Sequence, residues 1–458
     1  MGVFPRFMIA AAHKSSGKTV ISTGLAAAFR AAGTDIGSFK KGPDYIDPMW
    51  LSAASGAPCY NLDFNAMERR EIIPFFASRA RARDLSMVEA NKGLFDGLNP
   101  DGSDSNAELA KLLDLPVILV IDTVGMTRGI APLLTGYTAF DAKVKIAGVI
   151  LNKVGGARHE GKLRKAVETY TDLAVVGSVW RDRALDIGER HLGLTTPAEM
   201  TRMERMIEDF GKIVARSVEL DTLQGIAQGA PDLAIPSGGP APVPQMGQGL
   251  RIGIARDTAF GFYYPDDLEA FEKAGAELVP IDMMNDMQLP EIDGLFIGGG
   301  FPEMRMEALA GNAALRADIR AKLAAGLPCY AECGGLMYLC ESLSWRGETH
   351  EMVGAIPARA VMHERPQGRG YVAFTGRASH PWGPRGTVRA HEFHYASIEG
   401  LPEGTVFARD MKRGQGIDGR HDAVVLGNTV AGFCHLRSTG PDPWVPRFLS
   451  FVAACKGP

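Results

Sequence analysis

One short segment near the start of the chain constrains the fold more than any other. A strand-like apolar run, Phe7 to Ala12, leads into a loop that ends in Ser16-Gly17-Lys18-Thr19, and a helix-like run, Lys18 to Ala32, begins there. A phosphate-binding loop pattern is informative only between a strand and a helix, which is its position here. Ala12 replaces the first glycine of the pattern, so the match is incomplete. The segment predicts an α/β fold whose sheet is mostly parallel.

The chemistry of this loop points to a bound nucleotide. Backbone N–H groups at the start of a helix face a phosphate, Lys18 offers a positive charge, and the Thr19 hydroxyl can bind Mg²⁺. We therefore expect ATP at Ser16, Gly17, Lys18 and Thr19, with ATP as a co-substrate. The alternative is a chance Gly-Lys-Thr sequence at a helix start. Lys14 is either a second phosphate ligand or a solvated lysine.

The length of the chain predicts two domains. At 458 residues it exceeds the size at which one hydrophobic core keeps growing. Strand-like and helix-like runs alternate through residues 1–222, residues 223–250 are dense in Pro, Gly, Ala and Gln, and a second α/β domain spans residues 251–458. In the first domain the expected strands are Phe7 to Ala12, Leu85 to Ala90, Val117 to Asp122, Lys145 to Asn152 and Ala174 to Val179. In the second domain the expected helices are Pro265 to Ala274 and Glu303 to Ala325.

Charge and cysteine content favour a small-molecule enzyme. Lys and Arg number 49 against 53 Asp and Glu, without a long charged run, which argues against nucleic acid or a membrane as partner. No apolar run approaches the roughly 18 residues that span a bilayer, and the first residues lack a leader pattern. The six cysteines form no C-x-x-C pair, so we expect reduced thiols and a cytoplasmic protein.

One cysteine stands where a nucleophile would stand. Cys333 follows an apolar strand and precedes Gly334 and a helix-like run, which permits a sharp turn and favours a thiolate. His435, after a later apolar strand, is the expected base. Backbone N–H groups of Gly299, Gly300 and Gly334 are expected to form an oxyanion hole. For Gly299 and Gly300 the alternative is a plain strand-to-helix turn.

Three further stretches carry a family resemblance. They are Lys41-Gly42-Pro43-Asp44-Tyr45-Ile46-Asp47-Pro48, Val88-Glu89 with Gly93-Leu94-Phe95-Asp96-Gly97, and Glu189-Arg190-His191-Leu192-Gly193-Leu194. With the phosphate loop they resemble the cobyrinic acid a,c-diamide synthase family over essentially the whole chain. The resemblance implies an N-terminal P-loop, dethiobiotin-synthetase-like parallel-sheet domain and a C-terminal class I glutamine amidotransferase-like α/β domain.

The resemblance also implies a reaction. ATP would phosphorylate a carboxylate of a modified tetrapyrrole, and ammonia released from glutamine at Cys333 would displace the phosphate, at the c and the a side chains. Such a transfer gathers negative charge and needs hard oxygen ligands for Mg²⁺. The resemblance assigns the metal to Asp44, Asp47 and Glu89, beside Thr19. Asp96 and Asp122 are weaker candidates, and Tyr45 is either a substrate contact or a core aromatic.

Several positions keep two interpretations. The two aspartates could instead cap turns. Asn152 either contacts adenine or caps a turn, and His191 is either structural or catalytic. His391-Glu392-Phe393-His394 either lines the glutamine site or binds a metal, and strand alternation places His391 and Glu392 on opposite faces. Class I amidotransferases usually carry a Glu two residues after the base, but Arg437 stands there, so we expect a Cys333–His435 pair without a third member.

The substrate also stays open. Relatives in the resembled family amidate cobyrinic acid, hydrogenobyrinic acid, nickel sirohydrochlorin or sirohaem. A cobyrinic-acid-type tetrapyrrole is the expected substrate. Arg437 and the stretch Gly125-Met126-Thr127-Arg128-Gly129-Ile130-Ala131 depart from the expected cobalamin-type sequence and keep sirohaem or sirohydrochlorin as the alternative. A regulatory P-loop ATPase and a simple tetrapyrrole-binding protein stay open as well, and so does a homodimer.

Overall fold

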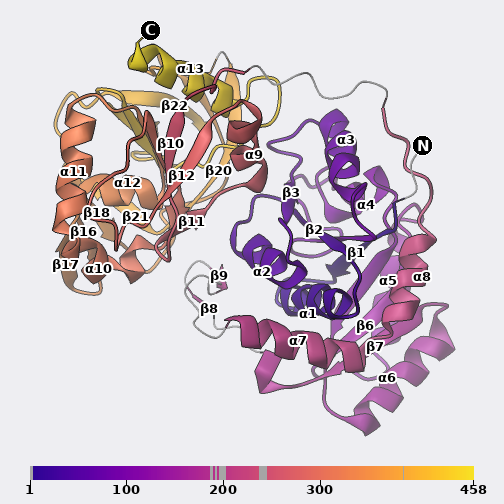
Figure 1. The fold of residues 1–458 in the computed structure, drawn as a ribbon. Coiled ribbons are helices and arrows are strands. Elements are labelled where there is room, and N and C mark those ends of the chain that lie inside the picture. The colour runs from indigo at the N-terminus through magenta and orange to yellow at the C-terminus, as the bar shows by residue number, and fades with distance from the viewer. Residues whose placement is uncertain are drawn as a thin grey trace. The chain divides into compact units, whose positions relative to one another are not determined.

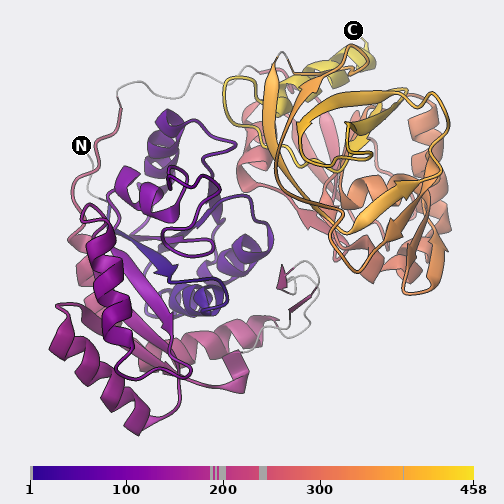
Figure 2. The ribbon, with the colours of Figure 1, turned by 180° about the vertical axis from the view of Figure 1, so that it is seen from behind.

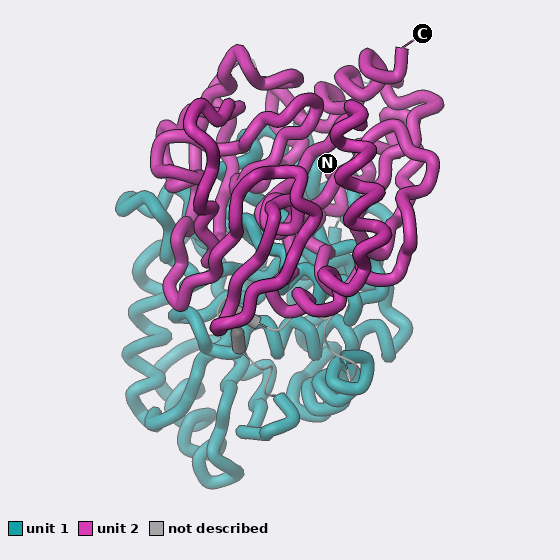
Figure 3. Tube along the Cα trace, turned by 90° about the vertical axis from the view of Figure 1, so that its left-hand side faces the viewer, with its two compact units in different colours: residues 1–240 teal, residues 241–458 magenta. Residues whose placement is uncertain are grey.

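The structure, a computed structural model, describes residues 4–185, 189–190, 193–194, 203–236, 245–384 and 386–457. These residues divide into two units, 1–240 and 241–458, which Figure 3 shows in different colours. The ribbon in Figure 1 follows the chain from the first unit into the second. Each unit carries its own sheet and its own core.

A parallel seven-stranded sheet organises the first unit, in the order β3-β2-β4-β1-β5-β6-β7. Its strands are β1 (Arg6–Ala11), β2 (Ile36–Lys41), β3 (Tyr60–Leu62), β4 (Leu85–Glu89), β5 (Val117–Asp122), β6 (Ile146–Val154) and β7 (Ala174–Trp180). The central strand β1 pairs in parallel with both β4 and β5. The loop after β1 therefore begins at the carboxyl edge of the sheet, where open α/β folds bind ligands.

Helices cover both faces of this sheet. One core cluster contains residues of α1 (Lys18–Ala31), α2 (Ile46–Ser55), α7 (Met203–Ser217) and α8 (Leu220–Gln228). The other contains residues of α3 (Arg69–Ala80), α4 (Asn106–Leu112), α5 (Ile130–Phe140) and α6 (Ala157–Tyr170). The first unit also holds a short 3-10 turn, η1 (Arg183–Leu185), and the strands β8 (Glu189–Arg190) and β9 (Gly193–Leu194).

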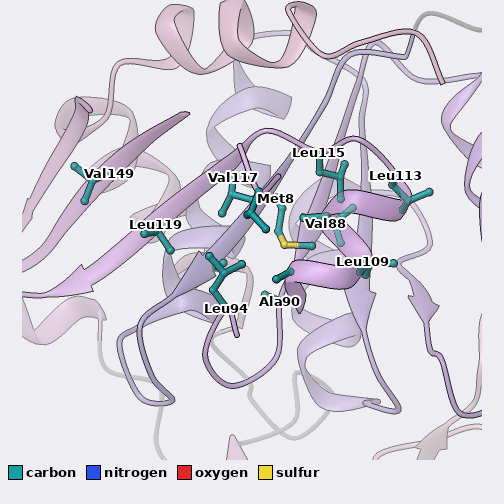
Figure 4. Packing of buried hydrophobic residues seen from close by; sticks show 14 of the residues in the cluster. Met8, Val88, Ala90, Leu94, Leu109, Leu113, Leu115, Val117, Leu119 and Val149 are labelled. Carbon is teal, nitrogen blue, oxygen red and sulfur yellow. The ribbon is translucent and has the colours of Figure 1, made fainter. Parts of the chain in front are cut away.

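Alternating side chains of β1 supply both cores. Met8 and Ala10 belong to one cluster, whereas Phe7, Ile9 and Ala11 belong to the other, and all five are fully buried. Figure 4 shows Met8 packed among side chains from β4, β5 and α4. A strand with two buried faces is typical of a parallel sheet between helical layers. The predicted fold class of the first unit is confirmed.

A mixed nine-stranded sheet organises the second unit, in the order β12-β10-β13-β15-β24-β23-β22-β19-β20. Its first five strands are parallel: β12 (Glu277–Ile281), β10 (Arg251–Ala255), β13 (Gly294–Ile297), β15 (Cys329–Glu332) and β24 (Thr429–Gly432). The antiparallel extension, visible from behind in Figure 2, is β23 (His421–Leu426), β22 (Phe407–Arg413), β19 (Gly368–Gly376) and β20 (Thr387–His394).

The rest of the second unit packs on the two faces of this sheet. One core cluster contains residues of α9 (Pro265–Lys273) and α13 (Trp444–Lys456). The other contains residues of α10, α11 and α12 and of a four-stranded sheet. The remaining elements are η3 (Pro302–Met304), α10 (Met306–Gly311), α11 (Ala313–Ala324), α12 (Gly334–Leu339), β16 (Cys340–Trp345), β17 (Glu348–Glu351), β18 (Ile356–Met362), β21 (Ala396–Glu399), β11 (Phe260–Phe262) and β14 (Gly299–Gly300).

Two predictions on element limits need correction. The segment 223–250, predicted as linker throughout, begins inside α8, where Leu223 and Ala227 are buried in the core of the first unit. The Pro and Gly density starts only after that helix. The single helix predicted from Glu303 to Ala325 is broken into η3, α10 and α11, and the Asn312 side chain caps α11 by accepting the Leu315 N–H.

Candidate active sites

The loop after β1 has the backbone of a phosphate-binding loop. Ser15 and Gly17 have positive φ angles of 64° and 86°, and α1 begins at Lys18. A Cβ on Gly17 would lie 2.3 Å from Nδ2 of Asn152, so only glycine fits there. Lys18 Nζ donates to the Lys92 carbonyl at 2.6 Å. Burial, and then repulsion from Lys40, lower the pKa of Lys18 to about 8.

A cavity of about 470 Å³ adjoins the loop. Asn152 lines it and donates from Nδ2 to the Ser16 carbonyl at 2.8 Å. The other lining residues are Gly17, Val20, Lys153, Trp180, Arg181, Asp182, Arg183 and Leu185. Asn152 thus anchors the loop from the end of β6, and its contact with adenine stays a prediction.

The four predicted metal ligands lie together, around a lysine that the sequence analysis did not single out. Lys40 Nζ lies 2.6 Å from Glu89 Oε1 and 3.8 Å from Asp44 Oδ2, and it donates to Asp47 Oδ2. Thr19 Oγ1 donates to Glu89 Oε1 at 3.2 Å. Lys40 is on β2 and Glu89 on β4, which are paired in parallel with these two residues in register. The register places their side chains on one face of the sheet edge.

Lys40 sets the electrostatics of this acidic cluster. Although burial works against it, attraction from Asp47 and Glu89 raises the pKa of Lys40 well above its ordinary value. Burial, and then repulsion from Asp47, raise the pKa of Asp44 to about 7. For Asp47, burial is outweighed by Lys40, which lowers the pKa. With all four groups charged, the three carboxylates around Lys40 leave two negative charges in excess, which is the charge that a cation or a cationic clamp would balance.

A divalent cation is chemically compatible with this cluster. Oε2 of Glu89 is buried and accepts no hydrogen bond within the described part of the chain. Carboxylate and hydroxyl oxygens are the ligands that Mg²⁺ prefers. The described residues contain no preformed group of three His, Cys, Asp or Glu ligands, and in this cluster Lys40 contacts all three carboxylates. The assignment of Mg²⁺ to Thr19, Asp44, Asp47 and Glu89 stays a prediction.

The other candidates of the first unit have local partners. Asp44 Oδ1 accepts the N–H groups of Ile46 and Asp47 at the start of α2, so its turn-forming role is realised too. Tyr45, the N-cap residue of α2, is buried. Asp96 Oδ2 accepts the Gly93 N–H at 3.1 Å. Asp122 forms an ion pair with Lys153 at 2.8 Å. His191 lies outside the described residues.

In the second unit, Cys333 occupies a strained turn between a strand and a helix. Its backbone angles are φ 48° and ψ −99°, directly after β15 and before α12. A Cβ on Gly335 would lie 2.4 Å from the Ile297 carbonyl oxygen, so the turn needs a glycine at that position. This is the geometry of a nucleophile elbow, which lifts the thiol from the end of the sheet. The predicted strand, elbow and helix are all present.

His435 lies beside the thiol. It follows β24, the parallel neighbour of β15, and its side chain is buried. Burial works to lower the pKa of His435, but hydrogen bonds with Cys333 and Glu332 and their charges raise it to about 10. A protonated imidazole next to a thiol is suited to protonate a departing ammonia. The structure therefore brings the two predicted catalytic side chains together.

The carboxylate at His435 comes from a residue that the sequence analysis missed. Glu332 Oε2 lies 3.3 Å from His435 Nδ1. Arg437 instead forms a buried ion pair with Asp266, with Nε 3.0 Å from Oδ2. The expected absence of a third member was based on position 437 alone and needs correction. The sequence shows a Glu directly before the nucleophile, but the pairing of its strand with the strand that leads to the histidine is known only from the structure.

The segment from His391 to His394 follows the predicted alternation. The His391 ring stacks on His435, with centroids 4.9 Å apart. On the other face, Glu392 accepts the N–H groups of Gln415 and Gly416, and the His394 ring stacks on Phe433. Burial, and then His435, lower the pKa of His391 well below its ordinary value. This geometry favours a role beside the thiol site over a metal site.

The glycines predicted for the oxyanion hole also lie near the thiol. β14 pairs with β11, and a Cβ on Gly299 would lie 2.7 Å from Cε1 of His435. A Cβ on Gly334 would lie 3.0 Å from the Gly300 nitrogen. Only glycines allow these two backbone segments to approach so closely. Their role as oxyanion donors stays a prediction.

Family comparisons agree with both units. Residues 7–194 match the CobQ/CobB/MinD/ParA nucleotide binding domain, and residues 251–442 match the CobB/CobQ-like glutamine amidotransferase domain. No helix among the described residues is long and apolar enough to cross a bilayer.

Three curated relatives, each named cobyrinate a,c-diamide synthase, match nearly end to end. The Magnetococcus marinus protein is 43% identical over 98% of this chain and 97% of its own length. The Methanosarcina acetivorans protein is 38% identical over 95% and 93%, and the Archaeoglobus fulgidus protein is 37% identical over 97% of both. The chain therefore belongs to the cobyrinate a,c-diamide synthase family, and it is a glutamine-dependent carbon–nitrogen ligase.

Proposed function

We propose that this enzyme amidates the a and c carboxylates of a cobyrinic-acid-type tetrapyrrole, using ATP and glutamine. The observation that carries the proposal is the presence of two separate chemical sites in one chain. The first unit has a phosphate loop beside Lys40 and an acidic cluster in which Glu89 is buried and Asp44 and Asp47 are partly exposed. The second has a buried thiol beside a histidine and a glutamate. Relatives with matching length are named for this reaction.

At the first site, the substrate carboxylate takes the γ-phosphoryl group of ATP and becomes an acyl phosphate. The loop N–H groups and Lys18 hold the phosphates, and Lys40 offsets the charge that gathers there. Thr19, Asp44, Asp47 and Glu89 would hold Mg²⁺, which supplies Lewis-acid stabilisation of phosphate oxygens when bound. Tyr45, directly after Asp44, is the proposed substrate contact in this unit.

At the second site, glutamine is hydrolysed through a thioester. The sulfur of Cys333 attacks the side-chain amide carbon, a C–S bond forms, and the C–N bond breaks as His435 gives a proton to the departing ammonia. N–H groups of Gly299, Gly300 and Gly334 stabilise the oxyanion. Water then hydrolyses the thioester to glutamate. The ammonia displaces phosphate from the acyl phosphate and forms the amide.

The experiment that tests this proposal is mass spectrometry of candidate substrates. The enzyme is incubated with ATP, Mg²⁺ and glutamine and with cobyrinic acid, sirohydrochlorin or sirohaem, and each amidation changes the mass by one fixed increment. We expect two increments on cobyrinic acid. Two increments on sirohaem with none on cobyrinic acid would contradict the proposed substrate. Arg437 forms a buried ion pair with Asp266. Its presence at this position therefore has a local structural reason and does not support sirohaem as the substrate.

A further inference from the structure

The imidazole of His435 needs a partner that fixes its ring. In thiol and hydroxyl nucleophile sites a carboxylate usually holds one ring nitrogen, so that the other faces the nucleophile. Arg437, two residues after His435, cannot hold the ring in this way because it has no carboxylate. Arg437 is buried, pairs with Asp266 and lies with its guanidinium 5.1 Å from the Tyr264 ring centroid.

Glu332 reaches the ring from another direction. It ends β15, and its register partner on β24 is Gly432, three residues before His435. Because the two strands are parallel, their carboxyl ends place Glu332 and His435 side by side. Oε2 of Glu332 lies 3.3 Å from Nδ1 of His435, and both side chains are about 2–3% exposed.

The second oxygen of Glu332 is held in place by its own partners. Oε1 accepts from the Tyr330 hydroxyl at 2.5 Å and from the Leu436 N–H at 2.8 Å. The Tyr330 hydroxyl in turn accepts from Arg409, which is paired with Asp422 at 3.0 Å. A carboxylate fixed through one oxygen presents the other in a defined direction. Such preorganisation is what an orienting group requires.

The neighbouring groups do not substitute for it. The titratable groups around His435 are Cys333 at the elbow, Glu332 on β15 and His391 on β20. His391 stacks on the ring rather than meeting its edge, and burial lowers its pKa, so it is neutral. Of these three groups, Glu332 alone is a carboxylate. It is therefore the group suited to stabilise a charged imidazole.

We propose that Glu332 is the positioning residue of the glutaminase site, and that its carboxylate accepts a hydrogen bond from Nδ1 of His435 so that Nε2 exchanges a proton with Cys333. This inference rests on the proposed function, since it requires glutamine hydrolysis at the thiol. The residue before the nucleophile thus takes the part of the glutamate that is absent at position 437.

The test uses Glu332→Gln in the full-length enzyme. The amide keeps an acceptor for the Leu436 N–H but removes the negative charge. Glutamate release should fall in kcat/KM by roughly 10- to 100-fold, a part of what a positioned acid–base group supplies. The alkaline limb of the pH profile, where His435 loses its proton, should move to lower pH, and the His435 resonance in histidine-labelled protein should titrate at lower pH as well. Amidation driven by ammonium salts should be unchanged.

The matched control is Asp267→Asn. Asp267 is also a buried carboxylate, but it forms hydrogen bonds with residues that follow His435 in the chain: it accepts the Ser438 N–H at 2.6 Å and the Trp444 indole N–H at 2.9 Å. This control should keep the wild-type pH profile. An unshifted His435 titration in Glu332→Gln, or an equal loss of ammonium-driven and glutamine-driven turnover, would overturn the proposal. Failure of the proposed function is distinguishable, because the wild-type enzyme would then add no amide to cobyrinic acid, whereas the role of Glu332 is tested by glutamate release and by the His435 titration.

Discussion

Nζ of Lys40 lies 2.6 Å from Oε1 of Glu89, and both side chains are almost completely buried. The pair joins two neighbouring strands at the edge of the sheet where the phosphate loop begins. A buried charge whose partner is removed is strongly destabilising. The pair therefore has a structural role as well as the proposed role in substrate activation.

Replacing Lys40 by methionine should destabilise the first unit. Glu89, Asp44 and Asp47 would face one another without the lysine between them, and the free energy of unfolding should fall by about 3–5 kcal/mol. Urea unfolding followed by tryptophan fluorescence measures this change. Arg83→Met is the control, because Arg83 pairs with Asp35 at a partly exposed site and should lose no more than about 1 kcal/mol. Equal losses in the two variants would contradict the structural role.

Replacing Gly17 by alanine should weaken ATP binding by at least about 10-fold, which corresponds to ~1.4 kcal/mol. A Cβ there would lie 2.3 Å from Nδ2 of Asn152, so the loop would have to shift. Titration calorimetry with ATP and Mg²⁺ measures the change. Gly33→Ala is the control, since Gly33 has nearly the same φ, 85°, but open space around its Cβ position. An equal loss of ATP affinity in both variants would mean that backbone strain alone is responsible.

The features predicted correctly from the sequence are those whose strand, turn and helix signals lie close together along the chain. The run from β1 through the loop into α1 and the sequence around Cys333 carry strand, turn and helix signals within a few residues. The three acids of the first unit were identified through the family resemblance. Lys40 and Glu332 were missed because their roles arise from strand pairing: β2 lies beside β4, and β15 lies beside β24. Residues far apart in the sequence meet there, and no local pattern records the pairing.

Replacing Arg437 by glutamine should destabilise the second unit more than it slows chemistry. Asp266 would be left buried without its cation, at a loss of about 3–5 kcal/mol. Its neighbour Asp267 already has a pKa raised well above its ordinary value by burial and by Asp266. Thermal unfolding and glutamate release measured on the same samples separate the effects. A large loss of kcat/KM with an unchanged melting temperature would assign Arg437 to catalysis instead.

The raised pKa of His435 makes stability depend on pH. The pKa is about 10 in the folded protein against an ordinary value of 6.5, so folding favours the protonated ring. This contribution is fully present below about pH 6.5 and is lost as the pH rises toward about 10. Between these limits the wild-type enzyme should lose at least ~1 kcal/mol relative to His435→Gln, since one pKa unit corresponds to about 1.4 kcal/mol. If the free energy of unfolding changed equally with pH in the two proteins across this range, the assignment would be contradicted.

The most direct test of the two-site account is turnover of Cys333→Ala with two nitrogen sources, with Cys329→Ala as a buried cysteine control from β15, the strand that leads to Cys333. We expect Cys333→Ala to lose glutamine-driven amidation while it keeps ammonium-driven amidation, because the proposed site of acyl phosphate formation is in the other unit. The Cys329→Ala enzyme should use both sources. A Cys333→Ala enzyme that fails with ammonium, or that still amidates with glutamine, would contradict the division of labour between the two sites.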